Sequence, residues 1–195
     1  RAGLPGAAVI LDASMAPALD NNFAGLLNPT SFDVIPPDTM GTAGPNHLVS
    51  ILNSDFGVFD KAGNILQQVS LDSFWASLGS GSGQPAQNPF DPRILYDQHS
   101  GRFIASSAGG GTSPNSWILI AVSSTSNPLD NWVKVAIDAD INNGTTQTSN
   151  GADYPTLGID NANIYISANM FNTSGFYQYS KVWVIPKSQL LSGQP

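Results

Sequence analysis

Three aspartates in this chain each lie within two residues of a proline and ahead of an apolar, β-forming run. They are Asp38, Asp91 and Asp153, and the intervals between them are 53 and 62 residues. Carboxylates that converge in a folded protein can hold a hard cation such as Ca²⁺, or act as acid and base in glycoside hydrolysis. In proline-containing turns they also accept bonds from backbone N–H groups, which is the purely structural alternative.

Two further aspartates, Asp138 and Asp140, alternate with apolar residues in a polar segment that runs to Gly144. This spacing is similar to part of a calcium loop, but the closing Glu of the EF-hand pattern is missing. All fourteen acidic residues of the chain are Asp and none is Glu. We therefore expect Ca²⁺ as the cofactor, with Asp38, Asp91, Asp153, Asp138 and Asp140 as its candidate ligands.

The catalytic alternative is a carbohydrate-active enzyme, similar to a glycoside hydrolase, that uses Asp38, Asp91 and Asp153. Other catalytic patterns are weak in this sequence. There are two histidines, His47 and His99, no cysteine, and no Gly-x-Ser-x-Gly sequence around a serine nucleophile. A non-catalytic role is therefore the leading interpretation.

Composition excludes some partners and favours one compartment. The formal net charge is −7, with only seven Lys and Arg residues, so clustered cations for nucleic-acid phosphates are not expected. No apolar run approaches the ~20 residues that a membrane-spanning helix needs. The low charge and the abundance of Asn, Ser, Thr and Gly favour a secreted or cell-surface protein. Because no charged-then-apolar leader opens the sequence, we expect that any signal peptide has already been removed.

Apolar alternation and turn residues predict short antiparallel strands. The expected strands of the middle sheet are 93–96, 102–107, 117–122 and 132–137, and those of the first sheet are 39–43, 48–52, 56–59 and 65–69. A third sheet has strands at 156–159, 163–168 and 181–185, followed by one helical turn at 187–191, and its fourth strand is missing. Residues 7–11 are a spare strand.

The recurrence of this plan predicts an all-β fold of consecutive four-stranded antiparallel blades of a β-propeller. The expected divisions are an N-terminal segment 1–37, blades at 38–78 and 84–140, and a partial blade at 153–191. Propellers need ~4 to 8 blades, so the ring is incomplete, and other copies or the remainder of a longer chain would complete it. A β-sandwich is the structural alternative.

Several motifs carry a resemblance to a known family. Segments 22–26, 36–47 (Pro-Pro-Asp-Thr-Met-Gly-Thr-Ala-Gly-Pro-Asn-His) and 58–64 resemble the opening of an uncharacterised family of bacterial exported, β-propeller-like proteins. Segments 91–97 and 153–159 are similar to that family's second and third blades. The motif order covers most of residues 22–193. The resemblance implies a secreted or surface-attached propeller-like region and no particular chemistry. At 87–90 this chain departs from the family's acidic stretch.

The sequence thus predicts a non-catalytic extracellular or cell-surface module for structure or binding, stabilised by calcium and part of a larger assembly. Its expected partners are other copies or the rest of a longer chain, and polysaccharide, with no nucleic acid and no membrane span. The carbohydrate-active enzyme remains the alternative.

Overall fold

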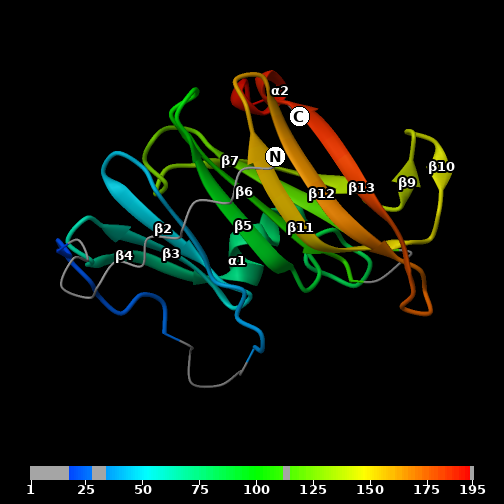
Figure 1. The fold of residues 1–195 in the computed structure, drawn as a ribbon, viewed down its shortest axis with the longest axis horizontal. Helices are drawn as coiled ribbons and strands as arrows, with labels where there is room; N and C mark the ends of the chain where they lie inside the picture. Colours follow the sequence, from blue (N-terminus) through cyan, green and yellow to red (C-terminus); the bar gives the residue numbers. More distant parts are fainter. Residues whose placement is uncertain (1–17, 28–33, 112–114, 194–195) are drawn as a thin grey trace, which may run out of the picture.

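The fold is a row of antiparallel sheets formed in chain order (Figure 1). A computed structural model describes residues 18–27, 34–111 and 115–193. Blade 1 contains β1 (Met40–Ala43), β2 (His47–Ile51), β3 (Asp55–Asp60) and β4 (Ile65–Ser70). Blade 2 contains β5 (Phe90–Asp97), β6 (Arg102–Gly109), β7 (Trp117–Ser123) and β8 (Trp132–Asp138). Blade 3 contains β11 (Gly151–Ile159), β12 (Asn163–Phe171) and β13 (Tyr177–Pro186). A small hairpin of β9 (Ile141–Asn142) and β10 (Thr146–Gln147) joins blades 2 and 3.

The all-β, repeated-blade fold expected from the sequence is confirmed. Blades 1 and 2 each pair their four strands in simple sequential order, and blade 3 pairs its three in the same way. Strands β5 to β8 therefore form one continuous four-stranded sheet, as predicted for this part of the chain. The third sheet is longer than its predicted strands, because β11 begins at Gly151 and β13 already begins at Tyr177.

The first strands of the three blades lie next to one another, as they do around the axis of a propeller. The backbone N–H of Tyr96 on β5 donates to Oγ1 of Thr42 on β1, at 3.1 Å. On the other side of β5, Arg93 Nε donates to the carbonyl of Pro155 on β11, at 2.6 Å. Across the described part of the chain no sheet closes on another, so these blades form an open arc.

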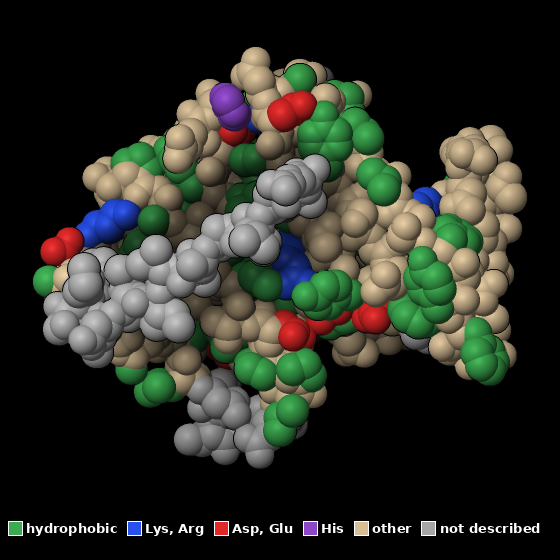
Figure 2. Space-filling model, in the orientation of Figure 1, with side chains coloured by type: hydrophobic (Ala, Val, Ile, Leu, Met, Phe, Trp, Pro, Cys, Tyr) green, Lys and Arg blue, Asp and Glu red, His purple; other side chains and the backbone are tan. Residues whose placement is uncertain are grey.

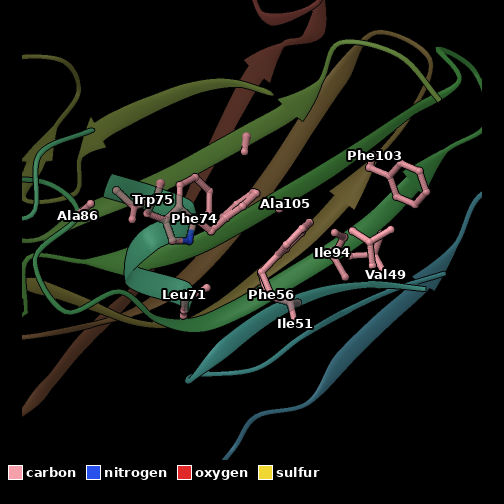
Figure 3. Close-up of a cluster of buried hydrophobic side chains, with 13 residues drawn as sticks. Val49, Ile51, Phe56, Leu71, Phe74, Trp75, Ala86, Ile94, Phe103 and Ala105 are labelled. Carbon is pink, nitrogen blue, oxygen red and sulfur yellow. The ribbon is translucent and has the colours of Figure 1, made fainter. Parts of the chain in front are cut away.

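Blades 1 and 2 are held together by an aromatic core (Figure 3). Phe56 of β3 stacks on Phe74 with ring centroids 4.3 Å apart, and Trp132 of β8 meets Phe56 edge-on at 5.8 Å. Trp75 is fully buried and donates its indole N–H to Ser107 of β6, at 3.0 Å. Burial of rings with a satisfied polar group gives this interface both apolar area and a fixed register.

Blades 2 and 3 meet through branched aliphatic residues. Ile118 and Ile120 of β7 pack with Ile164 and Ile166 of β12, and all four are fully buried. Blade 2 is thus covered on both faces, and β7 is apolar at almost every position because neither face is exposed to solvent.

The helical segments are short. Helix α2 (Lys187–Leu191) is the helical turn predicted from the sequence. Helix α1 (Leu71–Trp75) and the following 3₁₀ turn η2 (Ala76–Leu78) were not predicted. The side chain of Ser70 caps α1 by accepting the N–H of Ser73, at 3.1 Å. This turn places Phe74 and Trp75 between the first two blades.

The two ends of the row differ in how they are covered. On the outward face of blade 1, Leu26 lies against Gly57, and Phe23 packs on Phe59 with ring centroids 5.6 Å apart. We call residues 19–27 the N-terminal strap. At the other end, β13 has no partner strand on its outer edge among the described residues. The spare strand predicted at 7–11 lies outside those residues.

Candidate functional site

Two of the three predicted aspartates occupy the same backbone position at the start of a blade. Asp38 lies before β1 with φ of 46°, and Asp91 lies in β5 with φ of 50°. The residue with this conformation in blade 3 is Tyr154, with φ of 52°, and Asp153 precedes it. The Asp91 and Tyr154 positions are β-bulges, where the pairing register shifts between Phe90 and Arg93 in β5, and between Asp153 and Thr156 in β11. In blade 3 the residue structurally equivalent to Asp38 and Asp91 is therefore Tyr154, one position after Asp153.

Hydrogen bonds join these three positions across the blades. Asn53, in the turn between β2 and β3, donates its amide to Oδ2 of Asp38 at 2.7 Å and accepts the N–H of Asp91 at 2.7 Å. Asp91 in turn accepts the N–H of Tyr154 through its Oδ2, at 3.0 Å. Each blade therefore bonds the backbone bulge of the next blade. We call Asp38, Asn53, Asp91 and Tyr154 the blade-start chain.

Arg93 of β5 stabilises the same junction between blades 2 and 3. Its side chain is 8% exposed, and its Cζ lies 4.6 Å from the centroid of the Tyr154 ring. Together with its bond to Pro155, this stacking fixes the aromatic residue that holds the unusual φ. Sequence reasoning did not identify Asn53, Tyr154 or Arg93 as site residues. The signal available in the sequence was the shared proline at positions 92 and 155, which aligns Asp91 with Tyr154.

The electrostatics of the blade-start chain are those of a carboxyl pair. Burial, which is the largest effect, and a hydrogen bond with the carboxyl of Asp38 raise the pKa of Asp91 to about 6. The nearby charges of Asp153 and Asp38 act in the same direction, while the N–H of Tyr154 opposes them. The carboxyl group of Asp91 therefore binds a proton below about pH 6. Acidic side chains also gather in the lower centre of the face that Figure 2 displays.

The other two predicted ligands lie at a separate place, beyond the end of β8. Asp140 is fully buried, and its N–H donates to Oδ1 of Asp138 at 3.1 Å. Burial raises the pKa of Asp140, and a hydrogen bond with Asp138 adds to the effect. Gln147 donates to Oδ1 of Asp140, whereas Oδ2 has no hydrogen-bond partner in the described residues.

A lysine supplies the positive charge beside this second pair. Lys181 of β13 donates from Nζ to the carbonyls of Ala139 and Ile141, at 2.8 and 2.6 Å. Its charge lowers the pKa of Asp140, against the larger effect of burial. The backbone oxygens that a calcium loop would present to an ion accept bonds from an ammonium group here.

The predicted calcium ligands are thus divided between two places. In the described ranges, no three or more His, Cys, Asp or Glu side chains are grouped so that they could hold a metal ion. Each place offers one pair of aspartates, Asp38 with Asp91 and Asp138 with Asp140. Calcium binding remains a prediction, limited to pairs of carboxylates supplemented by backbone oxygens.

All six cationic side chains within the described residues bond to the protein's own oxygens. Besides Arg93 and Lys181, these are Lys187, whose Nζ lies 2.7 Å from Oδ2 of Asp97, and Arg102, which donates to the carbonyl of Ser123 at 2.9 Å. Lys61 donates to the carbonyl of Gly44 at 2.7 Å, and Lys134 donates to that of Phe74. These cations therefore stabilise the fold through intramolecular bonds, and they are spread over different elements.

Three surface hollows accompany the sheets. One of about 460 Å³ adjoins the blade-start chain and is lined by Asp153, Phe90 and Phe171. A second, of about 420 Å³, lies beside Trp132 and Lys134 between blades 1 and 2. A third, of about 480 Å³, follows the outer edge of β13.

Comparison with models of protein families gave no match, and searches among curated proteins and solved structures gave none either. The expected family resemblance therefore rests on the motifs alone. Among the described residues, none of the helices has the length and apolar character to cross a membrane.

Proposed function

We propose that this chain is a non-catalytic module of an exported or cell-surface protein, which serves structure and binding as part of a larger assembly. The observation that carries this proposal is the blade-start chain. Asp38 and Asp91 direct carboxylate oxygens at the amide of Asn53 and the N–H of Tyr154. These bonds link one blade to the next, which is a structural role.

The distribution of charge supports the same proposal. The described cations bond inward, so the outside of this acidic chain carries few groups that would attract phosphate or carboxylate ligands. A neutral polysaccharide, recognised through hydroxyl, amide and aromatic side chains, is the ligand class that suits such a surface. The composition and the motif resemblance support an extracellular location for this module.

One observation favours the carbohydrate-active enzyme as a second candidate. The pKa of Asp91 is raised to about 6, and its partner Asp38 is another carboxyl group. Glycosidases pair a carboxylic acid of raised pKa with an ionised carboxylate. The hollow beside Asp153 provides space near this pair.

An activity screen separates the two candidates. Purified protein is incubated with mixed polysaccharides at pH 5 to 7, and newly formed reducing ends are measured for the wild type, Asp91→Asn and Asp72→Asn. Asp72 is an exposed residue of α1 and is the matched control. The module proposal expects no sugar release from any of them. Release by the wild type and Asp72→Asn, but not by Asp91→Asn, would establish the enzyme instead.

A further inference from the structure

The hollow of about 420 Å³ between blades 1 and 2 combines an aromatic ring with several polar side chains. Its volume lies in the ~300–1,000 Å³ range of small-ligand sites. It is bordered by β4 and β8, the outer strands of their blades, whereas the blade-start chain lies where the first strands meet. Among the described residues, Asp153 is the only polar side chain that lines the hollow beside the blade-start chain. We call the hollow between β4 and β8 the outer groove.

Trp132 of β8 gives the outer groove an aromatic wall. Phe56 and Phe74 stack on each other with ring centroids 4.3 Å apart, and both meet Trp132 at nearly right angles, at 5.8 and 5.3 Å. Two stacked rings at such similar distances contact the indole from the same side. The indole N–H donates to the carbonyl of Pro128 at 2.9 Å, which fixes the orientation of the ring. Trp132 is partly exposed, so the rest of its surface is available to a ligand in the groove.

Uncommitted hydrogen-bonding groups surround this wall. They are the side-chain amides of Gln67 on β4 and Asn131 just before β8, and the hydroxyl of Ser77 in η2. All three residues are exposed, and none has a side-chain hydrogen bond to another described residue. Amides and hydroxyls both donate and accept. A neutral sugar presents hydroxyl groups around a ring with apolar C–H faces, so an aromatic wall bordered by such groups matches it.

The charges of the outer groove are balanced. Its two charged lining residues are Lys134, which donates to the carbonyl of Phe74, and Asp130, which accepts from Thr125 at 2.6 Å and Asn127 at 3.2 Å. One cation and one anion leave no excess charge to attract an ionic ligand. Both groups can still bond hydroxyls, because an ammonium has more donors, and a carboxylate more acceptor sites, than these bonds use. The groove therefore suits a neutral ligand.

We propose that the outer groove binds a neutral polysaccharide, with one sugar ring stacked against Trp132 and its hydroxyls bonded by Gln67 and Asn131. The inference rests on the proposed function, because it gives the binding module its ligand site. Gln67 belongs to blade 1 and Trp132 to blade 2, so the ligand bridges the two blades and raises the melting temperature of the protein. The aspartates of the blade-start chain take no part in this binding.

Affinity electrophoresis in native gels tests this site in the full chain. The gels contain xylan, galactomannan, β-1,3-glucan or soluble starch as the neutral polymer, and polygalacturonate as the anionic comparison. The wild type should be retarded by at least one neutral polymer. Gln67→Ala and Asn131→Ala should each weaken that binding about three- to tenfold, which corresponds to one lost hydrogen bond. Gln98→Ala is the matched control and should bind like the wild type, since Gln98 is an exposed glutamine in the turn between β5 and β6.

Trp132→Ala should weaken binding more than either amide variant, because it removes the aromatic wall. It also removes contacts with Phe56 and Phe74, so a thermal melt checks its folding, and the two exposed amide variants keep the test valid if it does not fold.

Equal retardation of the wild type, Gln67→Ala and Asn131→Ala would overturn the outer groove as the site while leaving the module proposal in place. Retardation by no neutral polymer, or by polygalacturonate alone, would overturn the inference as well. Sugar release in the activity screen would refute the non-catalytic module, whereas weaker retardation of the groove variants would still establish binding in the outer groove.

Discussion

Asp91 is the residue at which structure and electrostatics of this molecule are most closely linked. Its backbone N–H and its Oδ2 bond to neighbours in blades 1 and 3, and its carboxyl contacts that of Asp38. Asp91 thus connects three blades, and its carboxyl group is partly buried. A residue under these constraints should reveal itself through pH-dependent stability.

The first prediction follows from the direction of that pKa shift. The pKa of Asp91 is about 6 in the folded protein, above its ordinary value of 3.8, so the protonated form favours folding. This contribution is complete below about pH 4 and is lost as the pH rises through 6. Thermal melts should show wild-type stability falling between pH 4 and 7. Asp91→Asn keeps an acceptor for Tyr154 and should flatten this change. An equally steep profile in the variant would contradict the assignment.

Calcium provides a second prediction at the residue scale. If an ion binds either aspartate pair, EDTA should lower the melting temperature, and Ca²⁺ should restore it better than Mg²⁺. Ca²⁺ accepts irregular sets of carboxylate and carbonyl oxygens, whereas Mg²⁺ requires octahedral geometry and loses its bound waters reluctantly. Asp91→Asn and Asp138→Asn, measured separately, would assign the effect to one pair. An unchanged melting curve in EDTA would show that all five aspartates serve the fold alone.

At the scale of elements, the sequence predicted the positions of the strands well, but it aligned equivalent residues of different blades less well. Alternating apolar residues and turn residues located the strands of blades 1 and 2 to within a few residues, because pairing and burial act on the same alternation. Helix α1 was missed because five residues carry too little periodicity. Asp153 was aligned with Asp91 by residue type, whereas the backbone aligns Tyr154, since the bulge is defined by its left-handed conformation and the following proline. Contacts between distant segments, such as Asn53 with Asp91, have no local sequence signal.

Helix α2 gives the third prediction, through the buried ion pair that attaches it to blade 2. Lys187 is 2% exposed and Asp97 is fully buried. Burial raises the pKa of Asp97, but bonds from Lys187, Ser100 and the N–H of His99 outweigh it and leave the pKa below its ordinary value. Lys187→Met would leave a buried carboxylate without its cation, at a cost of about 3 kcal/mol in the free energy of unfolding at pH 7.

The matched variant is Asp97→Asn combined with Lys187→Met, which removes both charges. Urea unfolding should show it to be more stable than Lys187→Met alone. The contribution of the pair in the wild type should also diminish as the pH falls through the lowered pKa of Asp97, because its protonation removes the attraction. Equal stability of the single and double variants would show that the ion pair contributes little.

Helix α1 gives the fourth prediction, because it wedges aromatic rings between blades 1 and 2. Trp75 is fully buried and donates its indole N–H to Ser107. The ring centroids of Phe74 and Trp75 are 5.0 Å apart. Trp75→Ala should lower the free energy of unfolding by about 3–5 kcal/mol. Trp75→Phe keeps most of the volume and should lose less. Urea titrations of the two variants measure the difference, and similar losses would argue against a packing role for the ring.

At the scale of the whole molecule, blade 2 is the centre of an open row. It is the only blade in the described residues with both faces against another blade, through the aromatic core on one side and the aliphatic core on the other. Blades 1 and 3 each have one such face. The strap covers the outward face of blade 1. At the other end of the row, the outer edge of β13 in blade 3 has no partner strand among the described residues. Stability should therefore be graded along the row.

Hydrogen exchange measures this gradient and gives the fifth prediction. At a concentration where the protein is monomeric, the amides of β6 and β7 should exchange slowest, because their opening requires loss of both cores. Amides of β12 and β13 should exchange faster, since blade 3 can separate by breaking the aliphatic core and the bonds at Asp91, Arg93 and Lys187. Equal protection of all three blades in the monomer would show one cooperative unit, and the open row would then be held together by its junctions as strongly as by its sheets.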